Sequence, residues 1–238
     1  MMEIPVIYED SNIVAVNKSA GIVAHRSATE SDEKKNYLTD WLIEKYPTIK
    51  NVGDEPELRP GIVHRLDKET SGVLIIAKNQ ETFEFLKKQF KEKAVVKKYI
   101  ALLRGVLKED NGVIDLPIGK SKVDFRRRAI GKAARGELKE AHTEYRVLER
   151  FSDYTLVEVF IKTGRTHQIR VHFAAISKPL ACDHLYGAGK GKVCPQGLDR
   201  IFLHANYLEI SLPDDSKIKL EADLPEDLAG ALDLLRKK

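Results

Sequence analysis

The sequence predicts an α+β fold, a mixed, largely antiparallel central sheet with flanking helices and loops. Short strand-like apolar runs outnumber the helical patterns, and no strand–helix–strand rhythm repeats along the 238 residues. With 42% hydrophobic and 32% charged residues, the chain has enough apolar side chains for a real core. No Pro-, Gly- or Ser-rich linker interrupts it, so we expect one domain over residues 1–238.

The strands are predicted by alternating or continuous apolar runs with turn residues at their ends. They cover residues 6–8, 13–16, 72–77, 95–103, 144–148, 154–161 and 201–212, the last as a strand pair. A Glu-Asp-Ser-Asn turn separates the first two, and residues 151–153 join the fifth and sixth into a hairpin. The run at 72–77 is apolar without interruption, so we expect a buried strand there.

The helices are predicted by apolar residues at a period of 3.6 and by residues that begin or end helices. They cover residues 36–46, a segment after Asn79, residues 170–176 and residues 225–238. Pro47 and Pro179 end the first and third helices, and Asn79 is a suitable N-cap for the second. The fourth has acidic residues early and basic residues late, which suits the helix dipole.

Positive charge is unevenly distributed, although the net charge is only +4. Between Gly119 and Gly136 there are seven basic residues and a single acidic one, Asp124. Arg165 and Arg170 belong to a second basic cluster. Clustered cations on flexible backbone are typical of phosphate binding, and a solvated surface loop is the alternative. We expect the first segment to be a loop or an irregular hairpin.

Several classes of protein are excluded by what the sequence lacks. No apolar run approaches 18 residues, and the N-terminal residues do not resemble a signal peptide. Cys182 and Cys194 are too few for a disulfide framework and lack metal-binding spacing, so we expect two reduced thiols in a cytoplasmic protein. Dinucleotide, P-loop, hydrolase and metalloprotease motifs are missing, so we expect no cofactor and no metal.

One short charged loop stands out between two apolar segments. The stretch from His64 to Ser71 holds a single aspartate, Asp67, beside Arg65 and Lys68. Function often lies on loops that rigid strands hold in place. One carboxylate beside cations suits nucleophilic or acid/base work on a polyanionic substrate. The spacing alone does not take the interpretation further.

The stretch His64-Arg65-Leu66-Asp67-Lys68-Glu69-Thr70-Ser71-Gly72 resembles the signature HRLDxxTSG of the RluA family of pseudouridine synthases. Other segments resemble that family in the same order, at residues 12–21, 97–102, 163–172, 183–187 and 203–205. Ser19 stands where the family's first motif has proline. The resemblance runs from about residue 5 to about residue 230. It implies the pseudouridine synthase catalytic fold.

The resemblance implies isomerisation of a uridine within RNA to pseudouridine. The uracil would leave C1′, turn, and rejoin through its C5, with the nucleotide flipped out of its stack. Asp67 would be the catalytic carboxylate, either attacking covalently or removing the C2′ proton. Arg170 would pair with Asp67, with Arg165 as the competing candidate. Tyr99 would stack on the target base and assist the final proton step.

The resemblance and the charge pattern also suggest residues that bind substrate. Arg65 would fill the space of the flipped nucleotide or grip its phosphate, and Leu203 would line the pocket's apolar wall. His64 is a substrate-binding candidate whose alternative role is a structural hydrogen bond. Tyr99 and Leu203 could instead be core residues, Arg170 a helix cap, and Asp67 a plain partner of Arg65. The remaining candidates, on a mobile basic arm, are Arg126, Arg127 and Arg128.

The expected partner is RNA, either tRNA or rRNA, in a structured loop region. The expected protein is a cytoplasmic monomer without a separate N-terminal S4-type module, and the stretch from Gly187 to Arg200 is a surface loop of unassigned role. Two other classes stay open: an inactive RNA-binding protein or chaperone, and a nuclease or glycosylase that uses the same carboxylate.

Overall fold

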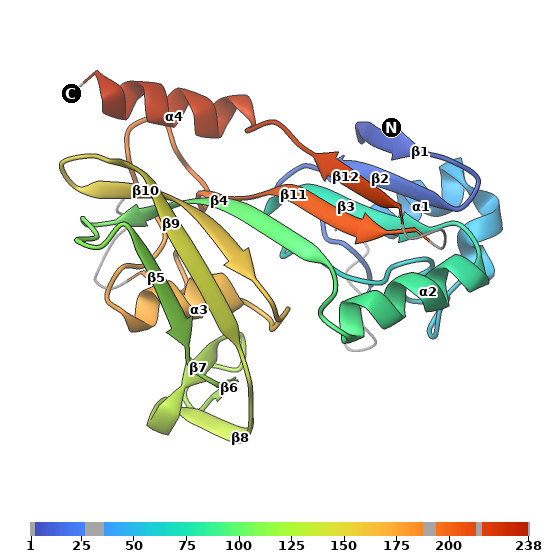
Figure 1. The fold of residues 1–238 in the computed structure, drawn as a ribbon, viewed down its shortest axis with the longest axis horizontal. Coiled ribbons are helices and arrows are strands. Elements are labelled where there is room, and N and C mark those ends of the chain that lie inside the picture. Colours follow the sequence, from blue (N-terminus) through green and yellow to red (C-terminus); the bar gives the residue numbers. More distant parts are fainter. Residues whose placement is uncertain (1–2, 27–35, 188–193, 213–215, 238) are drawn as a thin grey trace. The chain divides into compact units, whose positions relative to one another are not determined.

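The computed structural model describes residues 3–26, 36–187, 194–212 and 216–237 (Figure 1). The chain forms two compact units, Met1–Val96 with Ala205–Asp223 and Lys97–His204 with Leu224–Lys238. Each unit combines antiparallel strands with helices, so the α+β prediction is confirmed. The single domain over residues 1–238 stays a prediction. No helix within the described ranges is long and apolar enough to cross a membrane.

The first unit is built on a sheet of hydrogen-bonded strands. Its strands are β1 (Val6–Glu9), β2 (Ile13–Lys18), β3 (Ser71–Ala77), β11 (Leu203–Ser211, which begins in the second unit) and β12 (Lys217–Glu221). Strand β2 pairs with β3 so that Lys18 lies opposite Gly72. All residues of β3 are buried, as its apolar sequence predicts. The expected strand pair within residues 201–212 is wrong, because these residues supply β11 alone and β12 is its hairpin partner.

Helices α1 (Leu38–Lys45) and α2 (Gln80–Lys91) and the short 3-10 helix η1 (Pro47–Asn51) complete the first unit. The predicted N-cap of α2 is confirmed, since the Asn79 side chain accepts a 2.9 Å hydrogen bond from the Thr82 N–H. The Gln89 side chain binds the backbone N–H and C=O of Ser211, which ties α2 to the end of β11. Pro47 ends α1, but the chain continues as η1.

The second unit has a sheet in the order β4 (Val96–Arg104, which begins in the first unit), β10 (Tyr154–Ile161), β9 (His142–Arg150) and β5 (Asn111–Asp115). The predicted hairpin of β9 and β10 is confirmed. Helix α4 (Glu226–Arg236) packs Leu228 and Leu232 against Leu102 and Leu156. Helix α3 (Gln168–Ala175) packs Phe173 on Tyr145, which lies opposite Val159. Because side chains alternate along β10, α3 and α4 cover opposite faces.

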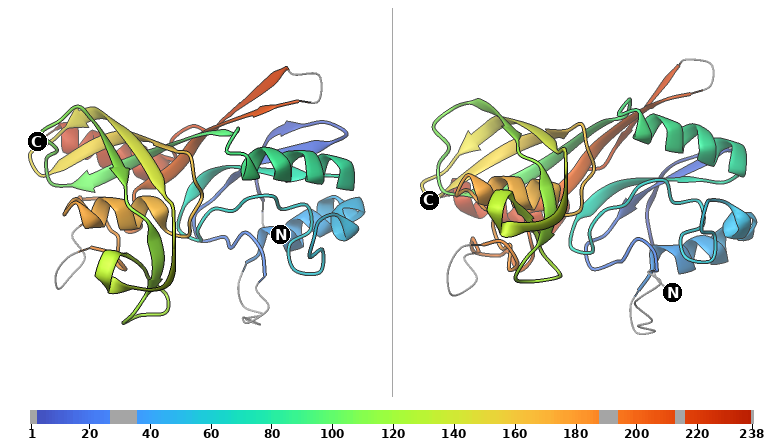
Figure 2. Two further views of the ribbon diagram at one scale, coloured as in Figure 1. Left: turned by 60° about the horizontal axis from the view of Figure 1, so that its bottom comes forward. Right: turned by 90° about the horizontal axis from the view of Figure 1, so that it is seen from below.

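The basic segment between residues 119 and 136 is more regular than the sequence predicts. It belongs to a three-stranded antiparallel sheet, β6 (Ile118–Ser121) between β7 (Arg128–Ile130) and β8 (Ala134–Lys139), with the short 3-10 helix η2 (Gly131–Ala133). We call this sheet and its turns the basic finger, residues 118–139. Figure 2 (left) shows it beside α3. The side chains of these strands are mostly polar, so they lack the alternation of apolar residues by which strands are predicted from sequence.

The expectation of two reduced thiols is wrong. Cys182 and Cys194 form a disulfide whose Cα atoms are 4.7 Å apart, within the range of about 4.4–6.8 Å that the bond requires. Cys182 is buried among core residues and Cys194 packs against the same cluster. Tertiary packing brings the two together across a separation of 12 residues, which no cysteine motif signals. The surface loop expected at 187–200 lies partly outside the described residues, at 188–193.

Candidate active site

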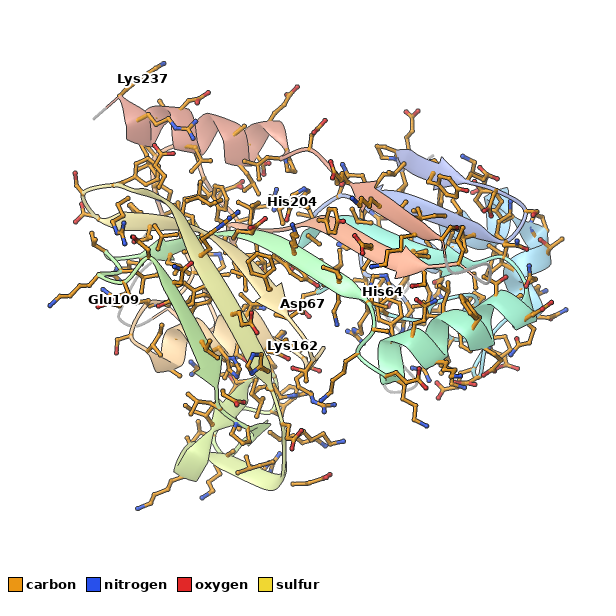
Figure 3. The ribbon with its side chains drawn as sticks, viewed as in Figure 1. His64, Asp67, Glu109, Lys162, His204 and Lys237 are labelled. Atoms are coloured by element: carbon orange, nitrogen blue, oxygen red, sulfur yellow. A yellow bond between two sulfur atoms is a disulfide. The ribbon has the colours of Figure 1, made fainter. Side chains whose placement is uncertain are left out.

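The loop from His64 to Ser71 is fastened to β3 before the chain enters that strand. Ile62 bridges Ile76, and the His64 Nε2 accepts a 3.0 Å hydrogen bond from the Ile75 N–H. The imidazole also stacks on Phe90 of α2, with ring centroids 4.6 Å apart. His64 and Asp67 are labelled in Figure 3. His64 therefore acts as a structural hydrogen-bond acceptor, the alternative that the sequence left open. Its role in binding substrate stays a prediction.

A buried lysine holds the same loop from the other side. Lys18 is 0% exposed, and its ammonium donates to the carbonyls of Ser19 at 3.0 Å, Ile22 at 3.0 Å and Lys68 at 3.3 Å. The Gly21 N–H donates to the same Lys68 carbonyl at 2.8 Å. A buried charge is tolerated only where such acceptors replace water. The motif around Lys18 thus fixes the backbone carbonyl of Lys68, the residue after Asp67.

Asp67 sits on this fixed backbone with its side chain half-buried. Its carbonyl accepts a 3.1 Å hydrogen bond from the Thr70 N–H, which closes the turn. Leu66 and Thr70 are buried on either side of it. Asp67 is therefore partly exposed while its backbone is held. This is the arrangement that chemistry by one positioned carboxylate requires.

Arg65 is exposed, and its Nη1 donates to His25 Nε2 at 3.1 Å. The other imidazole nitrogen of His25 lies 2.6 Å from the Arg26 carbonyl and donates to it. Burial lowers the pKa of His25, and the charges of Arg65 and Arg59 lower it further, outweighing the Arg26 carbonyl and Glu55. The ring is thus kept neutral and able to accept from Arg65. No pattern in the sequence singles out His25.

In the second unit, Arg170 of α3 forms a buried ion pair with Asp183. The guanidinium Nε and Nη2 lie 2.7 Å and 2.8 Å from the two carboxylate oxygens, and the side chains are 8% and 0% exposed. The carboxylate also accepts hydrogen bonds from the N–H groups of Leu185 and Tyr186. Burial by itself would raise the pKa of Asp183, but Arg170 and these N–H groups outweigh it and hold the pKa low.

Asp183 was not among the predicted site residues, although it belongs to a segment that resembles the family. The structure gives Arg170 this carboxylate partner within its own unit. Pairing of Arg170 with Asp67 stays a prediction.

Tyr186 joins the Arg170 ion pair to the basic finger. Its hydroxyl accepts a 2.7 Å hydrogen bond from the Arg128 N–H and lies 2.9 Å from His167 Nδ1. The guanidinium groups of Arg127 and Arg170 lie over its ring, 5.3 Å and 5.2 Å from the centroid. A guanidinium placed above an aromatic ring is attracted to the ring face by a cation–π interaction. Tyr186 therefore couples two cations of the predicted site to one turn.

The structure places the remaining predicted residues on regular elements or turns. Tyr99 of β4 lies opposite Val159, on the sheet face that α3 covers, and is 9% exposed. Leu203 begins β11 and is 3% exposed. Arg165 donates through Nε to the Glu140 carbonyl at 2.9 Å. Arg126 pairs with Asp124 at 2.8 Å in the basic finger. The roles of these residues in catalysis and substrate binding stay predictions.

A bound metal ion needs several side chains that converge on one point. In the described ranges, no group of three or more His, Cys, Asp or Glu residues has the geometry to hold one.

Replacing Asp183 by asparagine should destabilise the second unit by about 3–5 kcal/mol, because it leaves the buried Arg170 charge uncompensated. Urea unfolding measures this loss. The folded pKa of Asp183 lies below its unfolded value near 3.9. Its stabilisation is therefore complete above the unfolded value and lost as pH falls through the folded one. Asp124→Asn, at a surface ion pair with Arg126, should change stability much less than Asp183→Asn does. Equal stability of the two variants would contradict the assignment.

Replacing Arg65 by alanine should raise the pKa of His25, because a neighbouring cation is removed, but burial should keep it below its usual value. An NMR titration of the imidazole measures both. Arg59→Gln is the matched control and should raise this pKa less, because the Arg59 charge acts on the ring more weakly than the Arg65 charge does. In the wild type, stability should rise with pH from the folded pKa to about 6.5 and level off above it. An unchanged pKa in Arg65→Ala would show that the two groups do not meet in solution.

The chain is similar to known proteins of one family over most of its length. The model of the family described as RNA pseudouridylate synthase matches residues 12–175. A Bacillus subtilis protein named uncharacterized RNA pseudouridine synthase YlyB is 39% identical over 237 residues, 99% of this chain and 74% of that protein. Ribosomal large subunit pseudouridine synthase D of Borreliella burgdorferi is 40% identical over 223 residues, 94% of this chain and 66% of that protein.

A solved structure agrees with this. Human RNA pseudouridylate synthase domain containing 1 superposes with a TM-score of 0.77 at 27% identity, covering 96% of this chain and 87% of that one. The fixed aspartate loop thus lies inside a matched family model and in a shared fold. The chain belongs to the RNA pseudouridylate synthase family, and it is an isomerase that converts uridine to pseudouridine in RNA.

Proposed function

We propose that this enzyme modifies a uridine in an exposed loop of ribosomal RNA, with Asp67 as its catalytic carboxylate. The names of the Borreliella relative and of a Pseudomonas aeruginosa relative, 38% identical over 246 residues, support rRNA as the substrate. The observation that carries the role of Asp67 is its placement, a half-buried carboxylate on a loop that Lys18 and His64 fasten. A loop uridine is the cheapest to flip, because few stacking and pairing interactions are lost.

The reaction needs no net addition or removal of atoms. The C1′–N1 bond breaks, the uracil turns, and a C1′–C5 bond forms while the proton on C5 is lost and N1 gains one. Asp67 either attacks the nucleotide covalently or removes the C2′ proton, and both routes use the carboxylate form. In either route the backbone that carries Asp67 is held in place, which helps to position the carboxylate.

We propose that Arg170 orients the Asp67 carboxylate. Asp183 holds Nε and Nη2 of Arg170 on a buried turn, so the plane of the guanidinium and the direction of its Nη1 are fixed. A guanidinium with a fixed plane is well suited to aligning a carboxylate. Arg165 is the less favoured candidate, because one backbone carbonyl holds its guanidinium through Nε alone, and a single hydrogen bond fixes the plane of the guanidinium less well than two do.

Other residues are proposed to receive the flipped nucleotide. Tyr99 would stack on the uracil, and Leu203 would contribute an apolar wall. Arg65 would occupy the vacated stack or grip its phosphate, in an orientation that His25 supports. Arg126, Arg127 and Arg128 of the basic finger would contact the RNA backbone.

Asp67→Ala should abolish pseudouridine formation while RNA binding is retained, because the carboxylate takes part in the chemistry. The measurement is pseudouridine mapping by mass spectrometry in rRNA from a strain lacking the enzyme, complemented with each variant. Lys68→Ala is the matched control, since this exposed residue contributes its backbone to the loop, and it should restore the modification.

Restoration by Asp67→Ala would overturn the assignment of the carboxylate. Pseudouridine restored only in tRNA would overturn rRNA as the substrate. Release of free uracil would indicate a glycosylase instead.

A further inference from the structure

The tip of the basic finger exposes two apolar side chains between its cations. Phe125 is 80% exposed and Val123 is 89% exposed. A large aromatic side chain left in water forgoes the burial that stabilises most phenylalanines. Phe125 is directly followed by Arg126 and Arg127. An aromatic ring next to cations is the combination that single-stranded nucleic acids use as a stacking platform.

Hydrogen bonds order this tip. The Ser121 hydroxyl oxygen accepts from the N–H groups of Val123 and Asp124, at 3.2 Å and 3.3 Å. Asp124 in turn accepts from the Arg126 N–H at 3.0 Å and from its guanidinium at 3.1 Å and 2.8 Å. Phe125 therefore lies inside a closed turn, and its exposure is a property of that turn. The backbone that carries the ring is ordered in advance and therefore loses little freedom when a base stacks on Phe125.

A basic pocket lies beside the strands of the same finger. Its volume is about 470 Å³. Five basic residues line it: Lys120, Arg128, Arg135, Lys139 and Arg165. The acidic residue in its lining, Glu137, lies 3.8 Å from Lys139. Within the described part of the chain, Lys120, Arg128, Arg135 and Arg165 make no ion pair with a carboxylate. Their charge is thus available to an anion, and a phosphodiester group is the anion that RNA supplies.

The finger is joined to the Arg170 ion pair inside the second unit. The Arg128 N–H donates to the Tyr186 hydroxyl, and the Tyr186 N–H donates to Asp183, the partner of Arg170. A nucleotide bound on the finger would therefore be positioned relative to α3 through one short chain of contacts.

We propose that the basic finger binds an unpaired stretch of the substrate RNA, with one nucleobase stacked on Phe125 and a neighbouring phosphate in the basic pocket. This rests on the proposed function and deepens it by specifying unpaired RNA. Paired RNA keeps its base faces inside the helix, so the ring would have no base to stack on. A protein partner would use the ring and Val123 alike as apolar contacts.

The test is fluorescence anisotropy with a labelled RNA of about 12 nucleotides, a length that covers a typical single-strand site. The RNA is used alone and annealed to its complement, with the full-length enzyme. Phe125→Ala should raise the Kd for the single strand by about 5- to 150-fold, as expected for losing one base–aromatic stack. Phe125→Trp should restore binding, and the duplex Kd should be unaffected. Val123→Ala is the matched control at the same tip and should bind as the wild type does.

The pocket is tested separately through the salt dependence of binding. The association constant K falls as salt rises, so the slope of log K against log salt is negative. Arg135→Gln combined with Lys120→Gln should make this slope less steep by about 0.7 for each RNA phosphate that the variant no longer neutralises. An unchanged slope would remove the pocket from the interface. Equal losses in Phe125→Ala and Val123→Ala, or equal losses for single strand and duplex, would overturn the stacking role.

Failure of this proposal differs from failure of the proposed function. If Phe125→Ala binds single strands normally yet pseudouridine still depends on Asp67, only the finger proposal is wrong. If the finger behaves as expected but the wild-type enzyme restores no pseudouridine in rRNA, the proposed substrate is wrong.

Discussion

The second unit depends on one buried ion pair between Arg170 and Asp183. Removing two charges from water costs several kcal/mol for each ion, and the pair offsets this only because its hydrogen bonding is nearly complete. Two carboxylate–guanidinium bonds and two backbone N–H groups satisfy Asp183. The same contacts fix the turn that carries Tyr186, and Tyr186 fixes the start of β7. One electrostatic constraint therefore sets the position of α3 and of the basic finger.

The first unit uses a related device around Asp67. The buried ammonium of Lys18 is solvated by backbone carbonyls, one of which belongs to the residue after Asp67. His64 replaces a strand partner by accepting from β3. Gly72 then has to be glycine, because its φ is +120° and a Cβ would collide with the backbone of Ala205. The Asp67 loop is thus held by contacts of the buried Lys18 and of His64.

The residues that hold the site in place differ from those proposed to contact RNA. The groups that hold the site are buried and saturated with hydrogen bonds, whereas Arg65, Phe125 and Arg126 are exposed. Exposed cations and an exposed ring are adaptable contacts for a long, charged substrate. Buried charges are poor for that purpose, since water has already been exchanged for fixed partners. Substrate selectivity in this enzyme is therefore expected to lie in the basic finger, and the chemistry is proposed to lie in the fixed loop.

The sequence by itself determined the fold class, the cap of α2, the buried strand β3, the β9–β10 hairpin and the family. These features follow from local patterns and from short motifs, which can be recognised in the sequence before the fold is known. Tertiary structure decided the Arg170–Asp183 pair, the His25–Arg65 contact, the strands of the basic finger and the Cys182–Cys194 disulfide. Each of these joins residues through packing or through polar groups whose partners are distant or unpatterned. The sequence shows which chemistry a charged side chain can carry out, but its partner is determined by burial and geometry in the folded chain.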